Sequence, residues 1–227
     1  FIVYPSSAED AKGLIKTAAR SSDPVLFLEH KGLYRRLQAR TPEPDADYAV
    51  PFGKARVRRP GSDLTVVTWG STVYLALEVA EQMAAQGRSI EVIDLRSILP
   101  WDEEAVYASV RKTNRALVAH EDSLTMGFGA EIAARIAQNC FESLDAPLLR
   151  VAAKDCFVPS APTLEAEVLP SADDLRQELA RLRRQLFDLR FQWQAQEKPD
   201  TSQRRKLRRD IARIQTVLRE MELASAR

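Results

Sequence analysis

The sequence predicts an α/β fold with a mostly parallel sheet, preceded by a partial β-α-β unit and followed by an all-α antiparallel hairpin of two helices. Three observations support this prediction. Strand-like and helix-like segments alternate through residues 63–153, and the chain opens with one strand-helix-strand succession. Beyond Pro170 the apolar residues instead repeat in alternating steps of four and three.

The opening residues have the composition of a β-α-β unit. Residues 1–4 are apolar enough for a buried strand, and Ser6 or Ser7 can cap a helix with one apolar face. Residues 24–29 supply a second strand, as in the units from which parallel sheets are built. From 34 to 57 the chain is rich in Arg, Pro, Asp and Glu without a lasting period, so we expect a linker there.

The central segment alternates strand and helix. An apolar strand from residue 63 turns at Gly70 into an amphipathic helix that Gly87 ends. Asp102 can cap a later helix whose first turn is acidic and whose last turn is basic. Further strands are predicted at 90–95, 115–121 and 147–153, with helices starting near 103 and 128. This order predicts a parallel sheet covered on both faces.

The last quarter of the chain has a helical period. Two apolar seams, over residues 175–193 and 207–221, repeat in steps of four and three. Pro199 stops the first helix, and Thr201 or Ser202 can cap the second. Two such seams can pack against each other, so we expect an antiparallel helical hairpin.

The charge of the tail differs from that of the rest of the chain. From Ser171 onward, 14 Lys or Arg residues stand against 9 Asp or Glu, a net charge of +5, whereas the remainder has 19 against 23, a net charge of −4. The small overall charge of +1 therefore combines two unlike parts, which suggests two partners.

Composition excludes several classes of protein. A hydrophobic content of 45% is enough for an ordinary core and speaks against disorder throughout. Cys140 and Cys156 have neither metal-ligand nor CxxC spacing, so we expect reduced thiols and a cytoplasmic protein. The longest uncharged stretch, 64–77, is too short to cross a membrane. The first residues lack an initiator Met and a signal-peptide pattern, so Phe1 is expected to lie inside a longer chain.

Five motifs carry a specific resemblance. They are EHKGLYR, VTWGSTVYLAL, IEVIDLRSILPWD, HEDSLTMGFGAEIAARI and DCFVPSAPTLE, in this order. Residues 1 to about 175 resemble the C-terminal half of the β subunit of the decarboxylating, thiamine diphosphate-dependent component of 2-oxo acid dehydrogenase complexes. The resemblance implies a sheet of transketolase C-terminal type. It also implies an α-type dehydrogenase subunit and a lipoyl acyltransferase core as partners.

The resemblance also divides the chain. Residues 1–33 are expected to be a remnant of the pyrimidine-binding domain, 34–57 a linker, 58–172 a transketolase C-terminal-like domain and 173–227 the hairpin. In this family, the glutamate that activates the cofactor and an active-site histidine belong to the part that precedes Phe1. We therefore expect no catalytic or cofactor-binding residue in this chain, and no activity from it alone. Thiamine diphosphate and Mg²⁺ are expected only in an assembled holoenzyme.

Relatives of the family also hold a structural K⁺. The resemblance places that ion at the turn AARSSDP, with Ala18, Ala19, Ser21 and Asp23 as the matching positions. Ser21 stands where the family usually has an acidic residue. The alternative, which we favour, is an ordinary helix-to-strand turn capped by Ser21.

His120 and Glu121 invite a catalytic interpretation, because a histidine beside a carboxylate can carry out acid/base chemistry. In the family the pair belongs to the transketolase-type domain, away from the reacting thiazolium, so we favour a structural or interface role. The same holds for His30 and for the turn at residues 126–129, which lacks dinucleotide-loop spacing.

The tail has a resemblance of its own. LFDLRFQ and RKLRRDIARIQTVLRE are similar to the L-twenty-nine family of large-subunit ribosomal proteins, over residues 172 to about 223. The basic residues outside the apolar seam are expected to contact ribosomal RNA phosphates; they are Arg204, Arg205, Lys206, Arg208, Arg209 and Arg213. The alternative is a solvated hairpin that covers or dimerises the α/β domain. Two functions follow: an incomplete dehydrogenase β region fused to this hairpin, or a structural constituent of the large ribosomal subunit.

Overall fold

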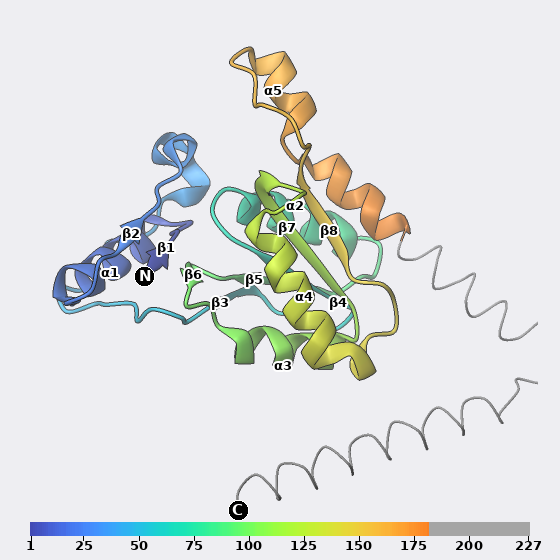
Figure 1. The fold of residues 1–227 in the computed structure, drawn as a ribbon, viewed down its shortest axis with the longest axis horizontal. Coiled ribbons are helices and arrows are strands. Elements are labelled where there is room, and N and C mark those ends of the chain that lie inside the picture. The colour runs from blue at the N-terminus through green and yellow to red at the C-terminus, as the bar shows by residue number, and fades with distance from the viewer. Residues whose placement is uncertain (182–227) are drawn as a thin grey trace, which may run out of the picture. The chain divides into compact units, whose positions relative to one another are not determined.

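The computed structural model describes residues 1–181 (Figure 1). Contacts divide the chain into a compact unit over Phe1–Arg184 and a second unit over Gln185–Arg227. Most of the predicted hairpin and all six predicted RNA-binding residues lie outside the described residues. The predicted domain boundaries at residues 33, 57 and 172 stay predictions.

The larger sheet has five strands in the order β3-β5-β4-β7-β8. Their bounds are β3 Arg56–Arg59, β4 Leu64–Thr68, β5 Ile90–Asp94, β7 Ala116–Ser123 and β8 Leu149–Ala153. The last four pair in parallel with one another, and β3 pairs antiparallel with β5 at the edge. The predicted α/β fold with a mostly parallel sheet is therefore confirmed.

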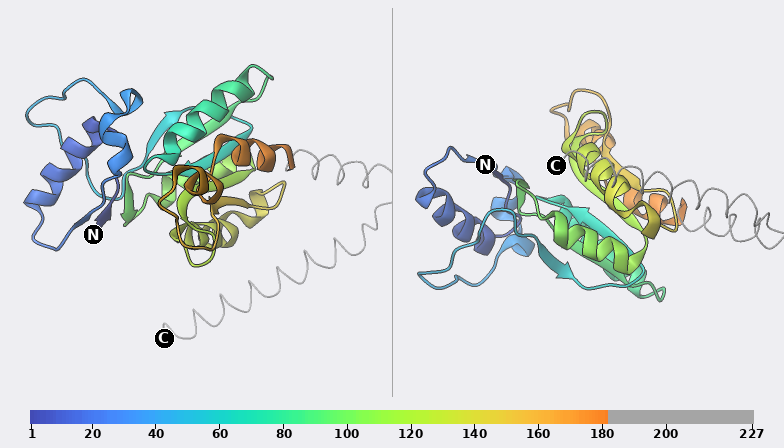
Figure 2. Two further views of the ribbon diagram at one scale, coloured as in Figure 1. Left: turned by 90° about the horizontal axis from the view of Figure 1, so that it is seen from above. Right: turned by 60° about the horizontal axis from the view of Figure 1, so that its bottom comes forward.

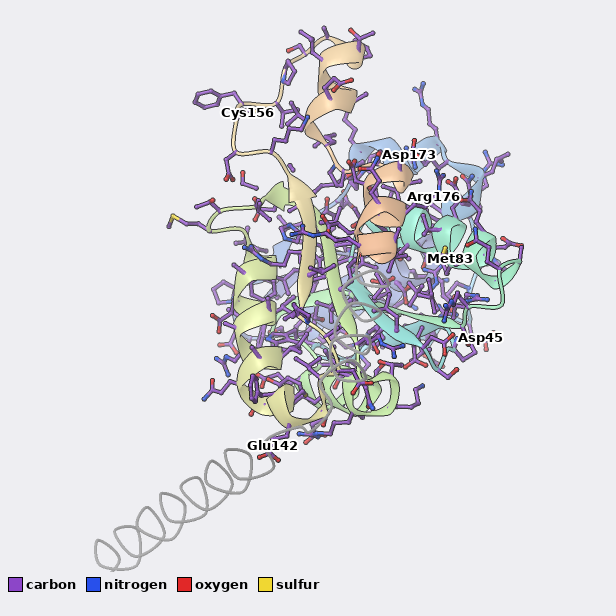
Figure 3. All side chains as sticks on the ribbon, turned by 90° about the vertical axis from the view of Figure 1, so that its right-hand side faces the viewer. Asp45, Met83, Glu142, Cys156, Asp173 and Arg176 are labelled. Atoms are coloured by element: carbon purple, nitrogen blue, oxygen red, sulfur yellow. The ribbon has the colours of Figure 1, made fainter. Side chains whose placement is uncertain are left out.

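Helices cover both faces of this sheet. They are α2 Thr72–Ala84, α3 Glu103–Thr113 and α4 Phe128–Cys140. Every residue of β4 and β5 is buried, as expected for a parallel strand covered on both sides. Side chains of α3 and α4 pack with Val67, Ile93 and Val118 in the main hydrophobic core. Figure 3 shows α4 on one side of the sheet and α2 on the other.

The caps of two helices follow the sequence prediction. The Asp102 carboxylate accepts a hydrogen bond from the Ala105 amide at the start of α3, and Asn114 ends that helix with left-handed backbone at φ 60°. Ser7 caps α1, Ala8–Arg20, by accepting from the Asp10 amide. The sequence left open whether Ser6 or Ser7 takes this position.

A smaller sheet of three strands contains the opening β-α-β unit. β1, Ile2–Val3, pairs in parallel with β2, Leu26–Phe27, and antiparallel with β6, Ser97–Leu99. Both β1 and β2 are shorter than the segments predicted from composition. The sequence analysis missed β6, which connects the N-terminal unit to the segment after β5 (Figure 2).

Buried ion pairs join the N-terminal unit to the larger sheet. The Arg96 guanidinium donates to the Asp10 carboxylate of α1 at 2.9 Å, and both side chains are largely inaccessible to solvent. Ser6 donates to Asp94 at the end of β5, and Arg58 lies 3.5 Å from the same carboxylate. Burial raises the pKa of Asp94 to about 6, even though Ser6 and Arg58 favour its charged form.

The segment expected to be a linker packs on α1. The 3-10 helix η1, Lys31–Arg35, overlaps its start, and the segment contains a second 3-10 helix, η2 Leu37–Ala39, and the residues that lead into β3. Val50 is buried with Val3 and Leu14, and its amide donates to the Gly13 carbonyl at 3.1 Å. A Cβ atom at Gly13 would overlap the Val50 side chain, so the close approach requires glycine.

Helices also follow the last strand. A short helix, α5 Pro162–Val168, was not predicted, and another helix runs from residue 172 to the end of the described residues. Leu175 and Leu179, the first two positions of the predicted seam, are buried at 1% and 8% exposure. Arg176 of the same helix lies 3.8 Å from Glu78 of α2. The start of the basic tail therefore packs on the α/β unit. No helix among the described residues has the length and hydropathy needed to span a membrane.

This packing predicts a stability difference between two leucines. Leu175→Ala should lower the free energy of unfolding of the α/β unit by about 2–5 kcal/mol, because it leaves a cavity in place of a fully buried side chain. Leu164→Ala in α5, where the side chain is 56% exposed, should change it by less than about 0.5 kcal/mol. Urea unfolding followed by circular dichroism measures both values. Equal effects of the two substitutions would contradict the packing.

Candidate functional site at the carboxyl edge of the sheet

Functional groups of parallel α/β folds lie where the strands end at their carboxyl edge. Here that edge includes Ser71 after β4, His120–Asp122 near the end of β7, and Asp155 after β8. Gly70 makes the sharp turn after β4 with φ 59°, and a Cβ atom at this position would lie only 3.1 Å from the Tyr4 ring. The edge therefore contacts the N-terminal unit directly.

His30 and Glu121 form the central contact of this edge. His30 Nε2 lies 3.0 Å from Glu121 Oε2, and both side chains are about three-quarters buried. The Ser71 hydroxyl donates to the other carboxylate oxygen of Glu121. These residues are far apart in the sequence, so the contact joins the segment before η1 to the ends of β4 and β7.

The contact shifts the pKa of both partners. The hydrogen bond with Glu121 raises the pKa of His30 against the opposing effect of burial. Burial acts to raise the pKa of Glu121, but the hydrogen bonds from His30 and Ser71 outweigh it and lower the pKa below its ordinary value. The arrangement thus favours a charged pair. Since the Ser71 hydroxyl is bound to the carboxylate and not to the imidazole, these three residues do not form a nucleophilic triad.

His120 is in a different environment from its neighbour Glu121. It is fully buried and stacks on Trp69, with the ring centroids 5.1 Å apart and the planes at 7°. Neither ring nitrogen has a hydrogen-bond partner among the described residues. Burial lowers the pKa of His120, which favours the neutral ring. A Cβ atom at Gly129 would overlap this ring, so the start of α4 is fitted around it. This environment supports the structural role expected for His120.

Hydrogen bonds join the loop after β7 to the loop after β8 beside this edge. The Thr125 amide and hydroxyl donate to the two carboxylate oxygens of Asp155, at 2.8 and 2.7 Å. Met126 adopts φ 63° in the first loop, and its side chain is 94% exposed. The turn at residues 126–129 thus places the Met126 side chain in solvent. Gly129 allows the start of α4 to pack closely against His120.

The predicted K⁺ positions lie together at the end of α1. The Ser21 amide donates to the Ala18 carbonyl at 3.1 Å, and the Ser21 hydroxyl accepts from the Asp23 amide at 3.1 Å. The same hydroxyl donates to the Asp23 carbonyl at 3.3 Å, and Ala19 is exposed. These hydrogen bonds match the ordinary turn that we favoured, and the K⁺ site stays a prediction. Within residues 1–181, no cluster of three or more His, Cys, Asp or Glu side chains has the arrangement of a metal site.

The sequence analysis missed two features of this region. One is Ser71, although its place directly after Gly70 in a strand-to-helix turn was a usable signal. The other is a cavity beside His30, which was not predictable because its walls come from two segments that are distant in the sequence, residues 5–11 and 29–40.

The contact between His30 and Glu121 predicts a pH-dependent coupling. In a double-mutant cycle with His30→Gln and Glu121→Gln, the coupling free energy between the two side chains should be about 1–2 kcal/mol at pH 6. A raised pKa in the folded state means that the stabilisation is complete below about pH 6.5, the ordinary pKa of histidine, and fades as the pH rises through the raised value. The coupling should therefore be much smaller at pH 9. Thermal unfolding of the four variants measures it, and an equal coupling at both pH values would contradict the account.

Known proteins resemble this chain in two regions. The model of the family described as "Transketolase, C-terminal domain" matches residues 53–175, and that described as "Ribosomal L29 protein" matches residues 170–220. The 2-oxoisovalerate dehydrogenase subunit beta of Bacillus subtilis is 43% identical over 76% of this chain and 52% of its own length. The mitochondrial pyruvate dehydrogenase E1 component subunit beta-2 of Oryza sativa is 43% identical over 77% of this chain and 46% of its own length.

A solved structure agrees with these matches. The "Split gene transketolase, inactive beta4 tetramer" has a TM-score of 0.65 and 25% identity, covering 80% of this chain and 57% of that one. The chain spans about half the length of the curated relatives it matches. The match over residues 53–175 and the transketolase-like arrangement of the sheet show that the chain belongs to the transketolase C-terminal domain family.

Proposed function

We propose that residues 1 to about 175 serve as the C-terminal region of a β-type subunit in a thiamine diphosphate-dependent 2-oxo acid dehydrogenase. The observation that carries this proposal is 43% identity to β subunits of such dehydrogenases over three-quarters of the chain. The reaction is oxidative decarboxylation of a 2-oxo acid with acyl transfer to a lipoyl group. Identity is equal to a 2-oxoisovalerate and to a pyruvate enzyme, so the proposal extends to both substrate types.

The described residues supply a scaffold for that reaction. His120 is buried against Trp69, and Glu121 is held by His30 and Ser71, which leaves neither group free to deprotonate a thiazolium. We assign thiamine diphosphate and Mg²⁺ only to the assembled holoenzyme, because this sequence has no Gly-Asp-Gly diphosphate motif. Within it, this chain contacts an α-type subunit and a lipoyl acyltransferase core, and it has no activity alone. The free thiols of Cys140 and Cys156 favour a cytoplasmic location.

A second function is supported by the tail. The match over residues 170–220 and the six basic residues from Arg204 to Arg213 favour binding to ribosomal RNA of the large subunit. Such binding would act through phosphate contacts and would weaken strongly with salt. The α/β unit would then be a passive fusion partner.

One gradient experiment separates the two functions. The full chain is co-expressed with the α-type subunit of the same organism, and the extract is sedimented in low salt. The enzyme function predicts that the chain travels with the α-type subunit. The ribosomal function predicts that it travels with the large ribosomal subunit, and that the variant Arg205→Glu, Arg208→Glu, Arg209→Glu leaves that fraction. Binding should fall at least about tenfold in this variant.

A charge-matched variant controls for the change in net charge. Arg20→Glu, Lys31→Glu, Arg35→Glu alters three exposed cations of the α/β unit and should stay with the ribosomal fraction. Failure to travel with the α-type subunit would overturn the enzyme function. Equal ribosomal binding by the tail variant and the wild-type chain would overturn the ribosomal function.

A further inference from the structure

A cavity of about 360 Å³ lies between the start of α1 and the segment that follows β2. Pro5, Ser6, Ser7 and Ala8 form one wall, and the η1 and η2 helices with their flanking residues form the other. This volume is within the range of small-molecule sites in proteins. The cavity includes His30 in its lining, so it adjoins the contact with Glu121 at the carboxyl edge of the sheet.

The charged side chains of the lining are mainly basic. Arg36 and Arg40 line the cavity together with His30, and Glu29 is the one acidic side chain among the lining residues. The Glu29 carboxylate accepts a hydrogen bond from the Tyr34 hydroxyl at 2.5 Å. Within residues 1–181, the side chains of Arg36 and Arg40 make neither an ion pair nor a hydrogen bond.

Nearby arginines form ion pairs, unlike Arg36 and Arg40. Arg56 pairs with Glu9 at 3.0 Å, Arg96 pairs with Asp10 at 2.9 Å, and Arg58 lies 3.5 Å from Asp94. The carboxylates of Glu9, Asp10 and Asp94 are thus already bound to other cations. Arg36 and Arg40 form no ion pair among the described residues, although the charge of Arg36 helps to lower the pKa of Glu121. Each guanidinium presents several N–H donors in a fixed plane.

The helix dipole of α1 adds little to this positive charge. Glu9 and Asp10 occupy its first turn, and the Glu9 and Asp10 amides are bound by the Thr41 and Ser7 hydroxyls. Any anion in the cavity would therefore be held by the arginines. Apolar side chains complete the lining, with Leu33 and Ala39 buried behind it. They offer contact to a carbon portion of the ligand.

From this combination we propose that the cavity binds a small organic phosphate, with the phosphate group between Arg36 and Arg40 and the carbon portion against Leu33. Arg36 and Arg40 together supply two positive charges, which match the double charge of a phosphate monoester above pH 7. A carboxylate brings one charge and leaves one arginine unpaired.

Phenyl phosphate is a suitable probe, because it combines a phosphate monoester with a small apolar group. Calorimetric titration of the full chain at pH 8 and fixed ionic strength should give saturable binding with a Kd below about 1 mM. Benzoate, with one charge, should bind at least about tenfold more weakly, and benzyl alcohol should not bind. Comparable binding of benzoate would overturn the assignment to phosphate.

Paired variants locate the site. Arg36→Gln, Arg40→Gln should weaken phenyl phosphate binding at least about tenfold, since both charge-assisted hydrogen bonds are lost. Lys31→Gln, Arg35→Gln removes the same charge from exposed positions outside the cavity lining and should bind like the wild type. Both variants alter exposed side chains, and circular dichroism checks that they fold. Equal affinity of the two variants, or no saturable binding to the wild type below about 10 mM, would overturn the proposal.

Discussion

The buried ion pair between Asp10 and Arg96 is the interaction on which the arrangement of residues 1–181 depends. Arg96 follows β5 with left-handed backbone at φ 57°, an uncommon conformation for a residue with a Cβ atom. Its guanidinium also donates to the carbonyls of Lys54 and Ala55. One side chain thus holds α1, the segment before β3 and the end of β5 together. A buried pair adds little net stability, but loss of one partner leaves an uncompensated charge, which strongly disfavours other arrangements.

This constraint positions the carboxyl edge of the sheet. Because α1 is fixed against the end of β5, the chain that follows β2 passes over the ends of β4 and β7, where His30 meets Glu121. The same path makes the cavity lined by Arg36 and Arg40. The contact at the edge and the proposed phosphate site therefore share one structural cause. Neither is a property of the five-stranded sheet alone.

The sequence was most informative where local rules dominate. Apolar runs, the Asp102 cap and the turn glycines fixed the central strands and helices, since each depends on neighbours in the chain. It did not reveal β6 or the packing of residues 34–57 on α1, because both depend on partners distant in the sequence. Side-chain partners such as His30 and Glu121 are 91 positions apart and have no local signature. Leu175 and Leu179 fit a helical seam, but the period did not reveal that they are buried in the α/β unit.

The central claim is that α1 and the five-stranded sheet form one cooperative unit through Arg96. Native-state hydrogen exchange measured by mass spectrometry tests it directly. Amides in α1 and β4 of the wild-type chain should exchange with the same free energy of opening, and Arg96→Met should speed exchange in α1 about a hundredfold or more. Arg35→Met, at an exposed position, should have no such effect. Faster exchange of α1 than of β4 in the wild-type chain, or unchanged exchange in the Arg96 variant, would contradict the account.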